Sequence, residues 1–390
     1  MRPARAALPL LALSLIASGC GATRPVPAVA PSHLTPAWTL QDAPATAQGA
    51  GIPEIGAGRV VVSGPSGELA TYALATGRLL WEQPVVADPS VLLGPALVLG
   101  SRVLIETATS LAAYGLGTGA LLWQVPLQGL ALAGTQPVPF AGLVVLPGAG
   151  LPMYDPSDGR MVRLLAPGVY PHPTSSDLAV QGSDLLVATT EGTIRAYAEG
   201  GRLVWEATAP PVAGPSGQPA GVGLVGVDPG SAGVVVAMEG VAFPCQSSCL
   251  DNGALEAVGL AAATGRVLWT QAPGDVLPVV AAEGLPVAVE TGQGMALSLA
   301  DGHVAWQWPQ QGTYRYASLE LVQGRLVAFD AAHGRLLLAD PRTGQTLDQQ
   351  SVPYAASQVA TLDARPHLAV GGGYAVVTSS DGHLVAFRIG

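Results

Sequence analysis

The chain has 390 residues, of which 49% are apolar and 11% are charged, and its formal net charge is −10. This composition supplies ample material for a core. An acidic chain with no lysine and no basic patch lacks the electrostatic signature of a nucleic-acid-binding protein. Its 50 glycines and 34 prolines are typical of short strands joined by turns when a sequence period is also present.

Residues 1–19 are predicted to be a lipoprotein signal peptide. Arg2 and Arg5 form a positive n-region, and the apolar run from Ala6 to Ile16 is too short for a stable membrane anchor. The run ends in Ala17-Ser18-Gly19-Cys20, which resembles the lipobox of bacterial lipoproteins. The resemblance implies lipid attachment at Cys20 and an extracytoplasmic, membrane-anchored protein that faces the periplasm if an outer membrane exists. An ordinary signal peptide that happens to contain a cysteine is the alternative.

Residues 20–35 are rich in proline and alanine and show no hydrophobic period, so we expect a flexible tether. From residue 36 to residue 390 the chain is organised by a repeat of about 40 residues. Its clearest copy is Leu69 to Val85, which is predicted to form a strand, a tight turn at Thr76-Gly77 and a second strand.

Two positions of this repeat recur along the chain. The turn glycines are Gly77, Gly119, Gly159, Gly201, Gly265, Gly302 and Gly344. Four residues after the glycine stands a tryptophan at Trp81, Trp123, Trp205, Trp269 and Trp306, with Arg163 and Asp348 in the two remaining units. The glycines are expected at positive φ, where a β-carbon is strained, and the tryptophans are expected to wedge against the neighbouring unit. Trp308 lies outside the pattern and is expected to be exposed.

Each unit holds four predicted strands, which in the first unit are 52–55, 59–63, 69–74 and 78–82. Four antiparallel strands joined by short turns form one propeller blade. No long window keeps a helical period, except a weak one at 355–365. The interval from Trp205 to Trp269 is longer than the others, and the excess is assigned to 210–233 and 243–253.

The two ends of the repeat region are complementary fragments. Trp38 sits in an isolated segment that matches the last strand of a unit, whereas the final unit, 374–389, stops where that strand is due. We therefore predict an all-β, eight-bladed propeller of four-stranded antiparallel blades, closed by the N-terminal strand, which completes the last blade.

The repeat resembles the quinoprotein, or PQQ-like, family. The best copies of its motif are 380–387 (SDGHLVAF) and 263–269 (ATGRVLW). The resemblance implies an eight-bladed propeller. The family includes quinoprotein dehydrogenases and also non-enzymatic lipoproteins, among them the propeller subunit of the outer-membrane barrel-assembly machinery. The fold alone therefore does not decide between these functions.

Catalytic and metal-binding patterns are missing from the sequence. None of the six histidines (His33, His172, His303, His333, His367 and His383) has metal-ligand spacing to another, and His303 and His383 are interpreted as surface turn residues. Glu54 and Glu320 fall on predicted inner strands, with Asp177 near another. They are interpreted as solvated acids of the central channel, and a paired-carboxylate site is the alternative.

The resemblance to dehydrogenases fails at the site itself. In that family a quinone is held between a tryptophan and a ring formed by adjacent cysteines, with a calcium ion beside it. This chain has no adjacent cysteines and no haem-binding motif; Cys245 and Cys249, which have three residues between them, are predicted to form a disulfide.

We therefore predict a protein without cofactor, metal or enzymatic activity. Its predicted function is that of a lipid-anchored scaffold, monomeric within a complex of other envelope proteins, with envelope or outer-membrane protein assembly as the expected process. A binding or sensing module for sugars or peptides and a PQQ-dependent dehydrogenase are the alternatives.

Overall fold

The structure is a computed structural model. It describes residues 32–41, 45–46, 49–64, 67–85, 94–107, 109–127, 136–169, 178–189, 193–208, 221–227, 234–240, 256–271, 276–280, 287–291, 295–308, 316–330, 333–353, 366–379 and 381–390. Within these residues every regular element is a β-strand. The segment 355–365, where the sequence left room for a helix, lies outside them.

The described strands form eight four-stranded antiparallel sheets, which we call blades 1 to 8, and one small hairpin of β2 (Ala45–Thr46) and β3 (Gly49–Ala50). The strands of each blade are given innermost first. Blade 1 consists of β4 (Ile52–Gly56), β5 (Arg59–Ser63), β6 (Glu68–Ala73) and β7 (Leu79–Pro84), and blade 2 of β8 (Leu97–Leu99), β9 (Arg102–Glu106), β10 (Ser110–Gly115) and β11 (Leu121–Pro126). Blade 3 consists of β12 (Val138–Phe140), β13 (Leu143–Val145), β14 (Pro152–Tyr154) and β15 (Met161–Leu164), and blade 4 of β16 (Leu178–Gln181), β17 (Asp184–Ala188), β18 (Thr193–Ala198) and β19 (Leu203–Thr208).

Blades 5 to 8 follow the same order. Blade 5 consists of β20 (Gly221–Val227), β21 (Val234–Gly240), β22 (Glu256–Ala261) and β23 (Val267–Gln271), and blade 6 of β24 (Val276–Val280), β25 (Val287–Thr291), β26 (Met295–Leu297) and β27 (Val304–Gln307). Blade 7 consists of β28 (Tyr316–Val322), β29 (Arg325–Asp330), β30 (Arg335–Ala339) and β31 (Thr346–Ser351), and blade 8 of β32 (His367–Gly371), β33 (Tyr374–Thr378), β34 (Leu384–Ile389) and β1 (Leu34–Leu40).

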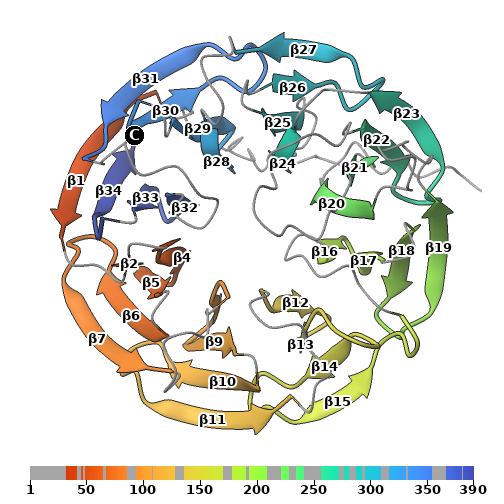
Figure 1. Ribbon diagram of the computed structural model, residues 1–390, viewed down its shortest axis with the longest axis horizontal. Helices are drawn as coiled ribbons and strands as arrows, with labels where there is room; N and C mark the ends of the chain where they lie inside the picture. Colours follow the sequence, from red (N-terminus) through yellow and green to blue (C-terminus); the bar gives the residue numbers. More distant parts are fainter. Residues whose placement is uncertain are drawn as a thin grey trace, which may run out of the picture.

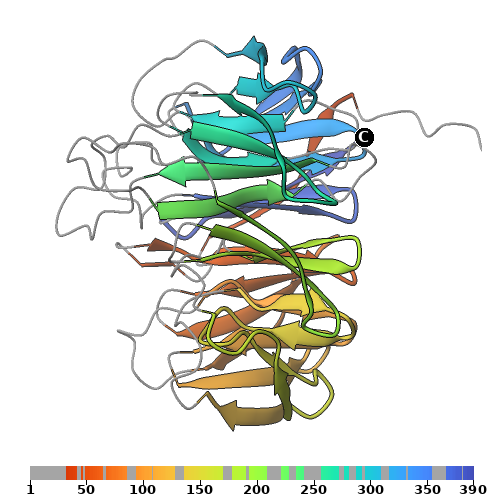
Figure 2. The same cartoon turned by 90° about the vertical axis from the view of Figure 1, so that its right-hand side faces the viewer.

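The blades are arranged as a ring (Figure 1), with the first strand of each blade near the centre and the fourth on the circumference. Turned by 90°, the ring appears as a disc whose strands run between its two faces (Figure 2). We call the face that carries the turns between third and fourth strands the turn face. The architecture is that of a β-propeller, as the sequence predicts.

The ends of the chain meet in blade 8. β1 pairs antiparallel with β34, with Leu34 opposite Ile389 and Leu40 opposite Leu384. The backbone amide of Ser32 also donates to the carbonyl of Gly390 at 2.7 Å. This is the pairing that the two partial repeats predict, and it supplies the fourth strand of the blade from the other end of the chain.

The strand boundaries in blade 1 agree with the sequence analysis to within about two residues, whereas two assignments in other blades differ. β1 begins at Leu34, two residues before the predicted domain boundary, because Leu34 is buried and paired. The innermost strand of blade 5, β20, lies inside the run 210–233, which the sequence analysis had assigned to excess loop. Alternating glycines weaken the strand signal there.

The core lies between adjacent blades. Val61 and Trp81 of blade 1, for example, belong to the same buried cluster as Ile105 and Tyr114 of blade 2. The aromatic residue before each turn is buried where the sequence supplies one, at Tyr72, Tyr114, Tyr154, Tyr197 and Phe387. Apolar burial thus joins each sheet to the next, so the blades stabilise one another.

Candidate functional site

The repeated tryptophans connect each blade to the next one. The indole Nε1 of Trp81 donates to the carbonyl of Leu116, in the turn of blade 2, at 2.9 Å. Equivalent bonds are Trp38 to Leu74 (2.7 Å), Trp123 to Pro156 (3.3 Å), Trp205 to Ala262 (2.6 Å), Trp269 to Leu299 (2.9 Å) and Trp306 to Pro341 (2.7 Å). In six of the eight junctions an indole therefore both packs and donates, which leaves its polar atom satisfied.

The turn glycines receive these indoles. A β-carbon added at Gly119, whose φ is +69°, would lie 2.7 Å from the ring of Trp81. At Gly77 the same addition would lie 2.8 Å from Trp38. The sequence argument for glycine rested on positive φ alone; the structure adds that the ring of the preceding blade occupies the space of a side chain.

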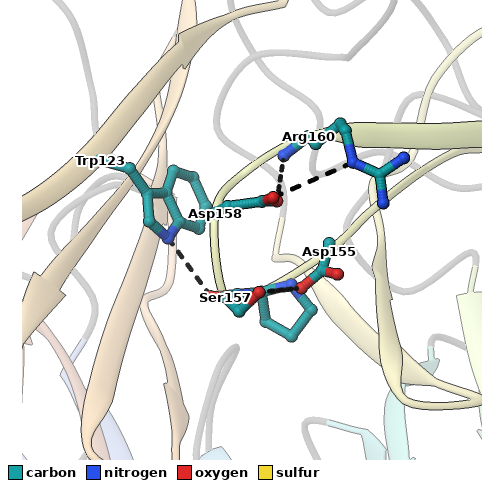
Figure 3. Close-up of polar contacts among 6 residues, drawn as sticks. Trp123, Asp155, Ser157, Asp158 and Arg160 are labelled. Atoms are coloured by element: carbon teal, nitrogen blue, oxygen red, sulfur yellow. Dashed lines mark hydrogen bonds and ion pairs between the residues drawn. The ribbon is translucent and has the colours of Figure 1, made fainter.

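Figure 3 shows the junction between blades 2 and 3 in detail. Asp155 Oδ1 accepts from the backbone amide and the hydroxyl of Ser157, at 2.8 and 2.6 Å. Asp158 Oδ1 accepts from the backbone amide of Arg160 at 2.9 Å. These bonds fix the turn whose Pro156 carbonyl accepts from Trp123. The bond between Asp155 and Ser157 lowers the pKa of the aspartate.

Two junctions use other chemistry. Arg163 Nη2 donates to the carbonyl of Glu199 in blade 4, so its guanidinium takes the place of the indole. Asp348 Oδ2 accepts from the backbone amide of Leu34 at 2.6 Å. Asp348 therefore bonds to the first residue of the closing strand β1 rather than to a turn. Correspondingly, Gly201 faces the Leu165 carbonyl rather than a tryptophan.

Trp308 differs from expectation. It is buried, with 8% of its surface exposed, and its Nε1 donates to the carbonyl of Gly344 at 2.6 Å. Its ring centroid lies 4.9 Å from that of Trp306. Trp308 thus supplies a second indole at the junction between blades 6 and 7, two residues after Trp306 and directly after the end of β27. Position in the repeat alone gave no signal for this packing.

A serine, an aspartate and a histidine meet in the hairpin between β33 and β34, but not in a catalytic order. The hydroxyl of Ser379 donates to Asp381 Oδ1, and the same oxygen lies 2.9 Å from His383 Nδ1. The opposite ring nitrogen of His383 lies 3.4 Å from the Gln41 amide. A nucleophilic serine needs its hydroxyl on the histidine ring, so this arrangement is a turn-stabilising network.

Other histidines among the described residues contact acids in their own turns. His303 is exposed and contacts Asp301 in its own turn, and His333 contacts Asp330. Among the residues that the structure describes, no group of three or more His, Cys, Asp or Glu is arranged to hold a metal ion. Cys20, Cys245, Cys249, His172 and Asp177 lie outside the described residues.

Glu54 and Glu320 lie on the innermost strands β4 and β28, as predicted. Burial raises the pKa of Glu54 to about 7. Burial likewise raises the pKa of Glu320 to about 7, and the negative charge of Glu54 adds to this rise. The side chain of Glu320 still contacts solvent. The surrounding strands therefore crowd these carboxyls without removing Glu320 from water.

This pair predicts a pH-dependent stability. The folded pKa of about 7 lies above the ordinary glutamate value of 4.5, so folding favours the protonated acid. The stabilisation is complete below pH 4.5 and is lost as the pH rises through 7. We expect Glu54→Gln to raise the melting temperature by a few degrees at about pH 8 and to change it little at about pH 5. The exposed Glu82→Gln is the control, and equal shifts at both pH values would contradict the prediction.

The sequence analysis missed a set of exposed apolar side chains on the outer strands. Large hydrophobic side chains stand exposed at the start of outer strands, just after the turn glycine: Leu79, Leu121, Leu122, Met161, Val162, Leu203, Val267, Leu268, Val304 and Leu347. Their signal in the sequence was the pair of apolar residues before each tryptophan. No helix among the described residues is long and apolar enough to span a membrane.

Comparison with known proteins places the chain in a family. A sequence profile described as outer membrane protein assembly factor BamB matches residues 26–92, 107–239 and 190–390. The chain belongs to the BamB family. The BamB structure from Moraxella catarrhalis is similar in fold, with a TM-score of 0.64 and 18% identity over 91% of this chain and 99% of that one.

The same fold occurs outside this family. The crystal structure of the computationally designed Ika8 protein has a TM-score of 0.63 and 14% identity, covering 93% of this chain and all of that one. No curated protein matches the chain in sequence. At these identities the structural likeness concerns the propeller alone, so membership in the BamB family rests on the sequence profile.

Proposed function

We propose that this protein is a lipid-anchored, extracytoplasmic scaffold that binds other envelope proteins during outer-membrane protein assembly. The observation that carries the proposal is the family match, which covers residues 26–92 and 107–390 and so includes strands of every blade. A propeller presents many inter-strand loops on a rigid frame, and binding to a protein needs only surface and shape there. We propose that the chain acts as a monomer within a complex.

The assembly role is tested in a cell that lacks this gene. We expect loss of the protein to lower the amount of folded outer-membrane barrel proteins, and the full-length chain to restore it. Crosslinking in intact membranes should capture an envelope protein of the assembly pathway. Normal levels of folded barrel proteins in the deletion strain, under conditions that increase the demand for barrel assembly, would contradict the assembly role.

Lipidation at Cys20 is the second part of the proposal, supported by the n-region, the short apolar run and Ala17-Ser18-Gly19-Cys20. Intact-mass analysis of the membrane fraction should show a mature chain that begins at an acylated Cys20. Cys20→Ser should release the chain from membranes while the ring stays folded. A mature chain cut elsewhere, or an unmodified Cys20, would show that the anchor is assigned wrongly.

We also propose that the protein binds no quinone. The sequence lacks the adjacent cysteines of the quinone site, and the serine, aspartate and histidine that meet in blade 8 are arranged to stabilise a turn. Mixing the purified protein with PQQ and calcium should give no bound cofactor absorbance and no dye reduction with alcohols or sugars. Stoichiometric binding with substrate-dependent dye reduction would move the chain into the dehydrogenase class.

A further inference from the structure

Two of the eight junctions between blades have another residue in place of the repeated tryptophan, and they lie on opposite sides of the ring. Three junctions in a row, from blade 8 to blade 3, have the tryptophan, and so do three in a row from blade 4 to blade 7. Arg163 and Asp348 take its place between blades 3 and 4 and between blades 7 and 8. We call these two the indole-free junctions. They divide the ring into two half rings, blades 8, 1, 2 and 3 and blades 4 to 7 (Figure 1).

The turns of the repeat show the same spacing of four blades. Blades 3 and 7, whose outer strands lack the tryptophan, are also the blades whose repeat turn begins with Asp-Pro, at Asp155-Pro156 and Asp340-Pro341. In both turns the proline carbonyl accepts the indole N–H of the preceding blade, at 3.3 and 2.7 Å. The absence of the tryptophan therefore recurs together with a second feature, four blades apart, and the two indole-free junctions are not unrelated exceptions.

The outer strands at the indole-free junctions, β15 and β31, contain no buried residue. Arg163 reaches the next blade through its bond to the carbonyl of Glu199, and Asp348 through its bond to the amide of Leu34. The Nε of Arg163 is buried and has no hydrogen-bond partner among the described residues. A packed indole stabilises a junction more than a hydrogen bond of a half-buried side chain does, so these two junctions should give way first at the turn face.

Buried apolar clusters cross both indole-free junctions closer to the centre of the ring. Met153 of β14 belongs to the same cluster as Leu185 of β17, and Phe329 of β29 belongs to the same cluster as Phe387 of β34. These four residues come from the second and third strands of their blades. At the rim, β1 adds the buried Leu34 beside the bond of Asp348. The half rings therefore stay joined on their inner strands, and these clusters can serve as the pivot of a tilt.

We propose that the ring is hinged: the two half rings tilt about the diameter that joins the indole-free junctions, and the turn face widens at both junctions together. A closed ring resists opening at a single junction while all the others hold, so a tilt requires two opposite junctions that yield. The bonds of Arg163 and Asp348 hold the hinge closed, since both lie at the turn face. A partner that bridges the half rings there binds one tilt better and shifts the equilibrium towards it. The hinge depends neither on the lipid anchor nor on the assembly role.

The test measures distances across junctions in the full-length protein by pulsed electron paramagnetic resonance. Spin labels are attached in pairs to genetically encoded residues on the turn face, which leaves the cysteines untouched. The labelled pairs, all at exposed positions, are Asp158 with Glu199 (blades 3 and 4), Thr343 with His33 (blades 7 and 8) and Thr76 with Thr118 (blades 1 and 2). We expect a broad or two-peaked distance distribution for the first two pairs and a single narrow one for the third.

Removal of the Arg163 bond should open the hinge on both sides of the ring. Arg163→Ala removes the donor to Glu199, so the fraction of long distances between blades 3 and 4 should rise several-fold. Because the tilt is shared, the same variant should raise the fraction of long distances between blades 7 and 8. Arg160→Ala is the matched control, since Arg160 is exposed, precedes Arg163 by three residues and carries the same charge. It should leave all three distributions unchanged.

The far junction decides the outcome, because a merely local role of Arg163 predicts no change between blades 7 and 8. A rise confined to the labels beside Arg163 would indicate local fraying and overturn the hinge. Equal widths for all three label pairs, or narrow distributions that Arg163→Ala leaves unchanged, would overturn it as well. The coupled rise at both indole-free junctions would support the hinge even in a protein that proved to have no acyl group or assembly role.

Discussion

Deletion of β1 (residues 34–40) is expected to unfold or aggregate the protein at ordinary temperature. The deletion removes the six-pair register with β34, the Trp38 indole from its place on Gly77 and the bond from Leu34 to Asp348. Together these changes should cost at least about 5 kcal/mol, which is a large part of the stability of a typical domain. They also leave the long edge of β34 exposed, which favours strand-to-strand aggregation.

Thermal melting and size-exclusion chromatography measure this effect. Deletion of 22–28, in the predicted tether, is the matched control and should leave the melting temperature unchanged. A smaller change isolates the closing bond: Asp348→Ala should destabilise by about 1–3 kcal/mol, and Asp348→Asn, which keeps an acceptor oxygen, should restore much of it. An unaltered melting curve after deletion of β1 would show that the ring does not depend on this strand.

Trp81→Ala is expected to destabilise the protein by about 3–5 kcal/mol. Trp81 is 8% exposed, packs on Gly119 and donates to the Leu116 carbonyl at 2.9 Å, so its loss opens a cavity and leaves a buried acceptor without its donor. Trp81→Phe keeps an aromatic ring but loses the N–H donor, so its free energy of unfolding should lie between those of the natural protein and Trp81→Ala. Urea denaturation measures the free energies of unfolding.

The matched control for this change is Leu79→Ala, two residues earlier on the same strand and 48% exposed. It should change the free energy of unfolding by less than about 1 kcal/mol. If Trp81→Ala costs no more than Leu79→Ala, the indole does not hold the two blades together. A broad, low-slope transition for Trp81→Ala would indicate that blade 1 separates before the rest of the ring.

The sequence was sufficient for the blades because their signals are local. Thr76-Gly77 marks a turn, a tryptophan follows at fixed spacing, and a short apolar run such as Val60 to Val62 marks a buried strand. Even the closing strand was predictable, because Trp38 is the tryptophan of the repeat in a segment that lacks the three preceding strands of a blade. These features depend on period and turn chemistry, which a single sequence displays.

Other features were not predictable, because they depend on contacts between distant residues. Trp308 lies off the period, and only the meeting of blades 6 and 7 gives its indole the Gly344 carbonyl. Asp348 had no visible role until β1 was placed beside β31. The raised pKa of Glu54 comes from crowding around the centre of the ring, and the sequence does not show which apolar residues at the starts of the outer strands stay exposed.

Function was less predictable than fold for a similar reason. Turn glycines and packing tryptophans are needed by any propeller of this type, whether or not it binds a cofactor. The designed Ika8 protein, at 14% identity, has a similar fold over 93% of this chain. The family match therefore carries the functional argument, and the ring supplies the frame on which a binding surface is built.

The hydrogen bond between Ser32 and Gly390 has a topological consequence. Since the two ends of the described chain touch, the ring has no first blade in a physical sense: the chain enters and leaves the ring at one seam in blade 8. A circularly permuted chain, joined from 390 to 32 and opened in the exposed turn tip 117–118, would retain every sheet pairing. The seam's location then governs where a tether can leave the ring, and evolution could move that exit from blade to blade without redesigning the fold.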